Sequence, residues 1–226
     1  MLEMLPSAIQ PNITTAQLLD ALYETLYMVS ISLVFSVLIG AVLGVILVVT
    51  REGHILSSPF IFNLLNPVIN VLRSIPFIIL LVAIIPITRA IVGTSVGTTA
   101  AIVPLVAYAA PYVARLVENS LLEVEPGILE AADAMGASKV QVITKFILPE
   151  AMGSLILTIT TVTIGLVGAT AMAGAIGAGG IGDVALTYGY QRFDNMTMLI
   201  TVVLLVLIVQ AVQTSGNYFS RKARRR

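Results

Sequence analysis

Four long stretches of this chain carry no charged side chain, and this feature limits its possible folds more than any other. Each stretch exceeds the roughly 20 residues that an α-helix needs to cross the hydrocarbon core of a bilayer. In the whole chain of 226 residues, 58% are hydrophobic and only 11% are charged, unlike soluble proteins. The sequence therefore predicts an all-α membrane protein. The four stretches are Thr25 to Thr50, Ala90 to Ala114, Ala151 to Gly182 and Asn195 to Ser220.

A fifth span is predicted between the first two of these stretches. The uncharged run from Ser74 to Thr88 is too short to cross a bilayer by itself. It reaches spanning length if its helix begins near Leu64 or Pro67 and carries Arg73 at its end. We therefore expect five transmembrane helices in a single domain that covers residues 1–226. Prolines are expected to bend the second and third helices, namely Pro76, Pro86, Pro104 and Pro111.

The basic residues predict the orientation of these spans. With the N-terminus outside and the C-terminus in the cytoplasm, ten Lys and Arg residues fall inside and two, Arg89 and Arg192, fall outside. The positive-inside rule favours this arrangement. The basic C-terminal tail is expected to contact the anionic lipid bilayer, and no nucleic acid. The ten inner residues are Arg51, Arg73, Arg115, Lys139, Lys145, Arg221, Lys222, Arg224, Arg225 and Arg226.

The loop between the third and fourth spans contains its own helix signals. Pro126 suits the first turn of a helix, because its missing N–H group has no partner there. A helix is predicted from Pro126 to Met135, and Gly136 is the residue expected to end it. Residues Ser138 to Gln141 form a capping box, which predicts a second helix that Pro149 ends or kinks.

One face of the first helix in this loop is suited to close contact. Ala131, Ala132 and Met135 share that face at helical spacing, and Glu130 adds a charge beside it. Two interpretations follow from these residues alone. The loop is a docking surface for a partner, or it is an ordinary surface helix-turn-helix between two spans.

The same residues resemble a known signature. Glu130 to Gly136, followed by Leu148-Pro149, is similar to the E-A-A-x-x-x-G-(nine residues)-I-x-L-P motif of permease subunits of binding-protein-dependent ABC importers. Phe146 stands where that family usually has Ile. The resemblance implies the ABC importer type I permease fold and a cytoplasmic coupling loop at about residues 118–150 that docks on a separate ATPase. The coupling residues it implies are Glu130, Ala131, Ala132, Met135, Gly136, Leu148 and Pro149.

A closer resemblance, to the methionine importer permeases, covers nearly the whole chain. It implies five spans, a homodimer of this chain, two ATP-binding ATPase subunits, an external substrate-binding lipoprotein and a place in the bacterial inner membrane. Methionine as substrate rests on this resemblance, and D-methionine, another amino acid or another small solute are alternatives. The residues that carry the resemblance are 73–82, 91–95, 109–111, 117–119 and 177–182, together with the coupling loop.

Several kinds of chemistry are not expected. No G-x-x-x-x-G-K-[ST] occurs, so ATP must be hydrolysed by another polypeptide. No catalytic residue, cofactor or metal site is predicted, because the chain has no cysteine and its one histidine, His54, lies in a polar turn. An ion-coupled secondary transporter would need ionisable residues near the midplane of the membrane. A purely structural membrane subunit would not need the coupling loop.

A glycine-rich run at residues 177–182 matches G-x-G-x-x-G. It follows an apolar span rather than a strand, so a dinucleotide site is not expected. Its glycines are expected to let the backbone bend at the outer mouth of a pathway. A re-entrant turn, a gate and a docking surface for an external partner all remain open.

Three residues are candidates for the pathway or gate. Met172 is a large flexible side chain among small residues, where it closes a passage between two copies or simply packs. Arg73 and Pro76 place a charge beside a proline in an apolar stretch, where the charge faces protein or water, or extends to the interface.

Two further pairs are expected to be structural. Gly40 and Gly44 form a G-x-x-x-G pair, which predicts close packing of the first span within the chain. Arg115 and Glu118 are three residues apart and are expected to pair at the surface of the third helix.

Overall fold

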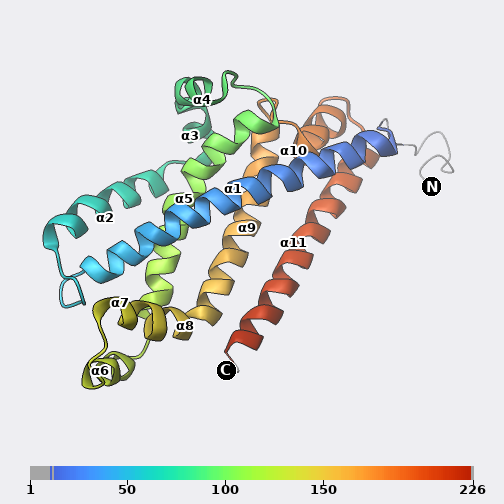
Figure 1. The fold of residues 1–226 in the computed structure, drawn as a ribbon. Helices are drawn as coiled ribbons and strands as arrows, with labels where there is room; N and C mark the ends of the chain where they lie inside the picture. Colours follow the sequence, from blue (N-terminus) through green and yellow to red (C-terminus); the bar gives the residue numbers. More distant parts are fainter. Residues whose placement is uncertain (1–10, 12, 225–226) are drawn as a thin grey trace. The chain divides into compact units, whose positions relative to one another are not determined.

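The computed structural model describes residue 11 and residues 13–224, and every regular element in them is a helix (Figure 1). The elements in chain order are α1 (Thr15–Thr50), α2 (Pro59–Ser74), α3 (Phe77–Ala83), α4 (Ile85–Val92), α5 (Thr98–Leu122), α6 (Pro126–Ala134), α7 (Lys139–Gln141), the π-helical segment η2 (Val142–Ile147), α8 (Leu148–Glu150), α9 (Met152–Gly174), α10 (Gly180–Val184), the π-helical segment η3 (Ala185–Tyr190) and α11 (Asn195–Ala223).

Four of these helices, α1, α5, α9 and α11, are long and apolar enough to cross a membrane. They overlap the four uncharged stretches of the sequence, although α1 begins ten residues before its stretch and α5 lies eight residues further along the chain. The bent pair of α2 and α3 gives a fifth span if the two are taken as one. The predicted all-α membrane fold is therefore confirmed.

The second span is bent, as the sequence predicted, and the bend is a break of 103° between two separate helices. Ile75 and Pro76 are extended, with ψ angles of 122° and 135°, and they separate α2 from α3. The ring of a proline disfavours helical backbone at the preceding residue, which explains the break at Ile75. Pro86 lies in the first turn of α4, after a second interruption at Ile84.

The prolines of the third span do not interrupt it. Pro104 and Pro111 both lie inside α5, which continues as one helix from Thr98 to Leu122. In the most apolar window of α5, 56% of residues are buried, against 11% in α11. Neighbouring segments therefore enclose more of α5 than of α11, and a membrane helix held by its neighbours tolerates internal prolines.

The chain forms two compact units, and each of the four long helices contributes to both. The first unit contains the described part of Met1–Val34 with Pro76–Ala107 and Thr163–Val212. The second contains Phe35–Ile75, Tyr108–Val162 and the described part of Gln213–Arg226. The prediction of a single domain stays a prediction.

In the second unit, α1 packs against α5 through glycine. A β-carbon on Gly40 would lie 2.5 Å from the Cβ of Val113, and one on Gly44 would lie 2.7 Å from the carbonyl oxygen of Ala114. Side chains do not tolerate such distances, so only glycine permits this approach. Gly40 and Gly44 thus pack within the chain, as predicted.

Hydroxyl groups join α9 to its neighbours in the same unit. The hydroxyls of Ser120 on α5 and Thr158 on α9 lie 3.1 Å apart, and Ser220 Oγ on α11 donates to the carbonyl oxygen of Gly153 at 2.8 Å. Lipid tails are as apolar as leucine, so apolar burial alone does not hold membrane helices together. Small residues and buried hydrogen bonds supply the specific contacts instead.

In the first unit, α10 packs on α1. Ile181 and Val184 of α10 form a buried cluster with Ala21 of α1 and with Ile13, which precedes it. Partly buried residues of α11, namely Leu204, Leu205 and Ile208, pack against this cluster.

We predict that Gly44→Val destabilises the protein by about 1–3 kcal/mol, because the new side chain must displace the backbone of α5. Thermal unfolding of the purified protein measures this effect. Gly127→Val on α6 is the matched control, since a β-carbon there meets no atom within 4 Å. Equal unfolding midpoints for the two variants would contradict the close approach of α1 and α5.

Candidate functional site

The first helix of the predicted coupling loop is present and ends where expected. α6 begins at Pro126 and finishes at Ala134, one residue before the expected end. Gly136 has a φ of +69°, the left-handed conformation that favours glycine. The amides of Gly136 and Ala137 donate to the carbonyl oxygens of Asp133 and Ala132 at 3.0 and 3.1 Å. These bonds are the usual glycine-ended helix terminus.

The three residues expected on one contact face of α6 differ in burial. Ala132 is fully buried and packs inside the chain, whereas Ala131 is exposed and Met135 is 65% exposed. The burial of Ala132 favours a role in holding α6 to its own chain, and a role in contact with a partner stays a prediction. The helix α6 as a whole packs against η2.

The second helix of the loop begins with the predicted capping box. The amide of Ser138 donates to Gln141 Oε1 at 2.8 Å, and the amide of Gln141 donates to Ser138 Oγ at 3.4 Å. Two amides that a helix start leaves without partners are thereby satisfied. Hydrogen bonds therefore fix the backbone on both sides of the turn at Gly136, at the end of the first helix and at the start of the second.

The last two residues of the signature, Leu148 and Pro149, follow a π-helical turn. The amide of Leu148 donates to the carbonyl oxygen of Ile143, five residues earlier, immediately before Pro149. The wider turn accommodates a proline, whose ring would clash with the preceding turn of a regular α-helix. The segment ends at Glu150, so Pro149 marks its end within one residue, as predicted. Phe146, which replaces the usual isoleucine, is half-buried.

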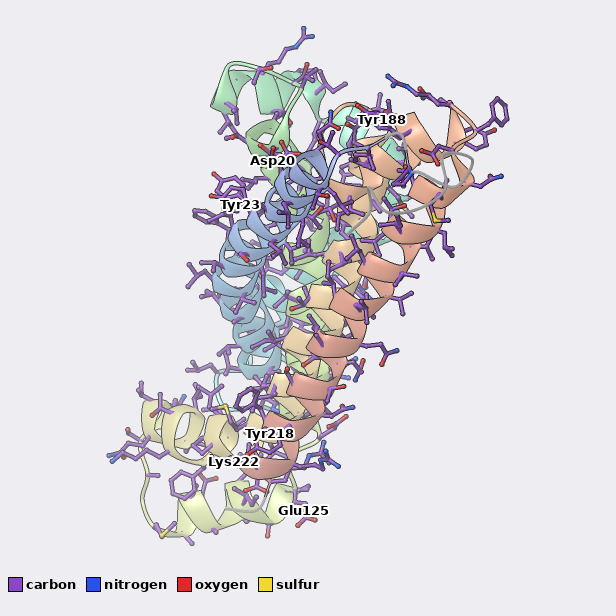
Figure 2. The ribbon with its side chains drawn as sticks, turned by 90° about the vertical axis from the view of Figure 1, so that its right-hand side faces the viewer. Asp20, Tyr23, Glu125, Tyr188, Tyr218 and Lys222 are labelled. Carbon is purple, nitrogen blue, oxygen red and sulfur yellow. The ribbon has the colours of Figure 1, made fainter. Side chains whose placement is uncertain are left out.

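The outward side of this helix-turn-helix carries acidic and apolar groups. Glu130, Ala131 and Asp133 are exposed on α6, and Met135 and Val140 are exposed on either side of the turn. Glu125, labelled in Figure 2, marks the start of α6. A short helix with a negative edge and a small apolar face is suited to insertion into a groove of a partner protein.

The glycine-rich run at residues 177–182 binds a carboxylate of its own chain. Gly179 and Gly180 have φ angles of +81° and +80° and turn the backbone into the start of α10. The amide of Gly180 donates to Glu24 Oε2 at 2.7 Å, and the amide of Ile181 donates to Thr25 Oγ1 at 2.9 Å. The two amides that would receive a phosphate are therefore occupied by α1. This contact excludes the dinucleotide interpretation and explains the run as a turn that attaches α10.

Met172 lies on an exposed stripe of α9. Its side chain is 54% exposed, and Gly168 and Ala175 are exposed at spacings of four and three residues from it. A β-carbon on Gly165 or Gly168 would meet no atom within 4 Å, so these glycines are not required by contacts within the chain. The stripe leaves room for close approach by another helix, with Met172 as its largest side chain.

Arg73 and Pro76 are separated by the break in the second span. Arg73 lies in the last turn of α2, with its guanidinium carbon 5.7 Å from the centre of the Tyr112 ring. The charge thus faces protein as a cation–π pair. Pro76 is the exposed residue before α3.

The carboxylate of Glu118 belongs to a network of ion pairs and hydrogen bonds, of which the sequence predicted one pair. Glu118 pairs with Arg115, as predicted, but it is 1% exposed rather than at the helix surface. Arg51 at the end of α1 lies 3.6 Å from the other oxygen of Glu118. Arg115 also donates to the side-chain oxygens of Asn66 and Asn70 at 2.6 and 2.8 Å. The network joins α1, α2 and α5, and no short-range sequence pattern indicates its long-range members.

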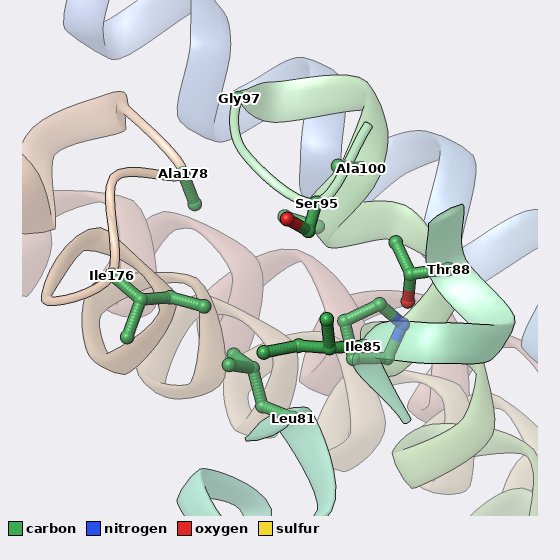
Figure 3. Close-up of a pocket in the computed structure, with 10 residues that line it drawn as sticks. Leu81, Ile85, Thr88, Ser95, Gly97, Ala100, Ile176 and Ala178 are labelled. Atoms are coloured by element: carbon green, nitrogen blue, oxygen red, sulfur yellow. The ribbon is translucent and has the colours of Figure 1, made fainter. Parts of the chain in front are cut away.

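A small cavity lies in the first unit, where α3, α4 and the start of α5 meet the loop after α9 (Figure 3). Leu81, Ile85 and Ile176 provide apolar walls, and Thr88 and Ser95 provide hydroxyl groups. Its volume of about 10 Å³ is enough for one water molecule, whereas ligand pockets usually reach about 300 Å³ or more. This cavity therefore does not hold an amino acid. Among the described residues, no group of three potential metal ligands occurs.

Residues 37–225 match the sequence profile of the family described as "Binding-protein-dependent transport system inner membrane component". A similar protein of Vibrio cholerae serotype O1, named "Probable D-methionine transport system permease protein MetI", is 47% identical over 91% of both chains. The "D-methionine transport system permease protein MetI" of Escherichia coli (strain K12) is 49% identical over 64% of this chain and 68% of that protein.

Solved structures share the fold. A chain of the MetNI methionine ABC transporter in an inward-facing conformation has a TM-score of 0.91 and 43% identity, over 97% of this chain and 99% of that one. A chain of an amino acid ABC transporter crystallised with histidines has a TM-score of 0.76 at 20% identity, over 92% and 94% of the two chains. The second likeness concerns the fold alone.

We predict that Gly136→Leu loosens the end of α6, because a β-carbon in the left-handed conformation costs about 1–2 kcal/mol. Hydrogen exchange at the amide of Ala137, which closes this turn, should become faster. Gly136→Asn is the control, since asparagine tolerates this conformation better than other side chains. A β-carbon at residue 136 meets no atom within 4 Å, so only the positive φ requires glycine. Exchange in the leucine variant as slow as in the wild type would contradict that requirement.

Proposed function

This chain belongs to the family of binding-protein-dependent transport system inner membrane components, and we propose that it is the permease subunit of an ATP-driven importer of methionine. The substrate is supported by relatives named for D-methionine transport and by the fold shared with the MetNI methionine transporter. L-methionine and D-methionine are both proposed substrates. Another amino acid or small solute is the alternative that an uptake assay separates.

The chain is a multi-pass membrane component of a transporter and not an enzyme. The sequence contains no P-loop, so a separate ATPase subunit must supply the energy. The proposed assembly contains two copies of this chain, two ATPase subunits and an external substrate-binding lipoprotein. The permease and ATPase parts are supported by the likeness to a chain of the MetNI transporter.

One observation carries the proposed coupling mechanism, namely the exposed face of α6 between Glu130 and Met135. Its carboxylates and small apolar patch are available to a groove on the ATPase. Ala132, by contrast, is buried within the chain, and α6 packs against η2, so a force on α6 reaches the helical segment that leads into α9. We infer that Glu130, Ala131 and Met135 contact the ATPase, while Ala132, Gly136, Leu148 and Pro149 determine how the segment is held.

Transport follows from this arrangement by alternating access. ATP binding closes the ATPase pair and draws the two α6 helices together, which opens the helix bundle toward the substrate-loaded binding protein. Hydrolysis and release reverse the movement. In this proposal the N-terminus lies outside and the C-terminus lies in the cytoplasm, so α6 is on the same side as the ATPase.

Ion-coupled transport is not favoured by the buried ionisable groups. Glu118 is the carboxylate that such a mechanism would use, but Arg115 and Arg51 both lie against it. Both oxygens of this carboxylate therefore already face cations of the same chain, which leaves little access for a coupling ion.

A second copy of the chain is proposed to contact the exposed stripe of α9. Gly165, Gly168 and Ala175 allow a partner helix to approach closely, as small residues do between membrane helices. Met172 from each copy would then meet at the interface and narrow the passage.

We predict that Glu130→Lys and Ala131→Asp abolish ATP-driven methionine uptake while the protein still reaches the membrane. The first reverses the charge of the docking face, and the second places an unpaired charge in a close contact. The measurements are uptake of labelled methionine and co-purification of the ATPase.

Glu52→Lys is the control for these variants, because Glu52 is also an exposed acid on the side proposed to be cytoplasmic but lies outside the coupling loop. It should retain uptake and co-purification. Near wild-type values for both α6 variants would remove the proposed docking face.

We further predict that Met172→Ala raises methionine leak through proteoliposomes in the absence of ATP, because a large side chain is removed from the narrow part of the passage. Ile159→Ala is the control on the same helix, because Ile159 is also exposed but lies on a different side of α9 from Gly168 and Met172. If Met172→Ala changes neither leak nor uptake, Met172 only packs against its surroundings.

A further inference from the structure

A groove of about 830 Å³ lies in the second unit, beside the coupling segment. It is formed by the last turns of α11, the first turns of α9, the end of η2 with α8, and Ile128 of α6. Figure 2 labels Lys222 in the last turn of α11, which lines this groove together with Lys145 of η2. The proposed coupling and transport mechanism assigns no role to this groove.

The groove is basic. Lys145, Lys222 and Arg224 line it, against one acidic residue, Glu150, so its net charge is two positive. All three basic side chains are exposed. Within the described part of the chain, the ion pairs that form involve Arg51 and Arg115 with Glu118, and none involves these three cations. The charges of Lys145 and Lys222 are therefore available to an external anion, whereas Arg224 also lines a neighbouring cavity that contains three glutamates.

The walls of the groove are apolar. Phe219 is 55% exposed, Met152 is also exposed, and Phe146 and Ile156 are half-buried. Large apolar side chains beside three cations match a molecule with a negative head and a hydrocarbon body. The proposed docking face of α6 differs from this groove in both respects. It is acidic rather than basic, and its apolar patch is small. One groove on the ATPase is not expected to fit both surfaces.

The end of α11 favours a lipid as that molecule. Only 11% of the most apolar window of α11 is buried within the chain, so this helix presents much of its surface to its surroundings. Basic pockets at the cytoplasmic ends of membrane helices attract anionic headgroups, with a contribution from each Lys or Arg near the surface. Lysine and arginine stems also extend easily from an apolar wall to a headgroup.

We propose that this groove binds an anionic phospholipid of the cytoplasmic leaflet, with its phosphate at Lys145, Lys222 and Arg224 and an acyl chain against Phe219 and Met152. The inference goes beyond the transport function and uses only the proposed orientation. The bound lipid bridges α11 to the segment that follows the coupling helix. It therefore stabilises the junction between η2 and α9 through which movement of α6 is transmitted.

The experiment measures lipids retained by the detergent-purified complex of permease and ATPase, by native mass spectrometry after addition of phosphatidylglycerol or phosphatidylcholine. We expect wild-type complex to retain phosphatidylglycerol in preference to phosphatidylcholine. Lys145→Gln combined with Lys222→Gln should weaken phosphatidylglycerol binding about 30-fold, the effect of removing two surface charges. Arg221→Gln is the matched control, because Arg221 precedes Lys222 on α11 but does not line the groove.

Three outcomes would overturn the proposal. Equal loss of lipid in Arg221→Gln would indicate general surface charge rather than a groove. Unchanged retention in the double variant would show that the groove binds no anionic lipid. Loss of ATPase co-purification in the double variant would show that the groove is a protein contact instead.

A further comparison separates the lipid from a free anion. Inorganic phosphate at millimolar concentration should not displace phosphatidylglycerol, because it lacks the acyl chain, and Phe219→Ser should weaken lipid binding without any change of charge. Displacement by phosphate, together with no effect of Phe219→Ser, would reduce the groove to an anion site and contradict the role of the apolar wall.

Discussion

The contact between α1 and α5 at Gly40 and Gly44 is the interaction on which the second unit depends. It brings two backbones to a distance that no side chain allows. Leu47, Ile69 and Ala114 form a buried cluster around it, and this cluster extends the contact to α2. In a membrane, where apolar burial gives little preference for one helix over another, such a fit of small residues determines which helices are neighbours.

The Glu118 network adds charge to the same three helices. Arg115 reaches from α5 to Asn66 and Asn70 on α2, while Arg51 at the end of α1 approaches the same carboxylate. A buried ion pair contributes less to stability than to specificity when its desolvation is considered. Here it connects helix ends near the proposed coupling loop, so α5 and α2 are joined by polar contacts as well as by packing.

Glycines with positive φ angles perform different tasks in the two units. Gly136 ends α6 with no atom near its missing β-carbon, so the requirement is conformational. Gly179 and Gly180 combine a positive φ with close contact to Glu24 and Thr25 of α1. The first glycine sets the direction of the coupling segment, and the second pair attaches α10.

The exposed surfaces of the second unit also differ in charge. The α6 face is acidic, and the groove beside α11 is basic, which suits two different partners.

Local sequence signals determined much of this protein, because they depend on neighbouring residues alone. Uncharged length located the four long spans, Gly136 and the Ser138–Gln141 capping box set the helix ends of the coupling loop, and spacing paired Arg115 with Glu118. Only the tertiary structure decided which of Ala131 and Ala132 faces outward, since both lie at suitable positions on a short helix and the packing of α6 on η2 chooses between them. It also decided that Pro76 interrupts a helix while Pro104 and Pro111 do not, because the neighbours of α5 hold that helix together. The partners of Gly180 and Glu118 come from distant parts of the chain, and no local pattern specifies contacts at such separations.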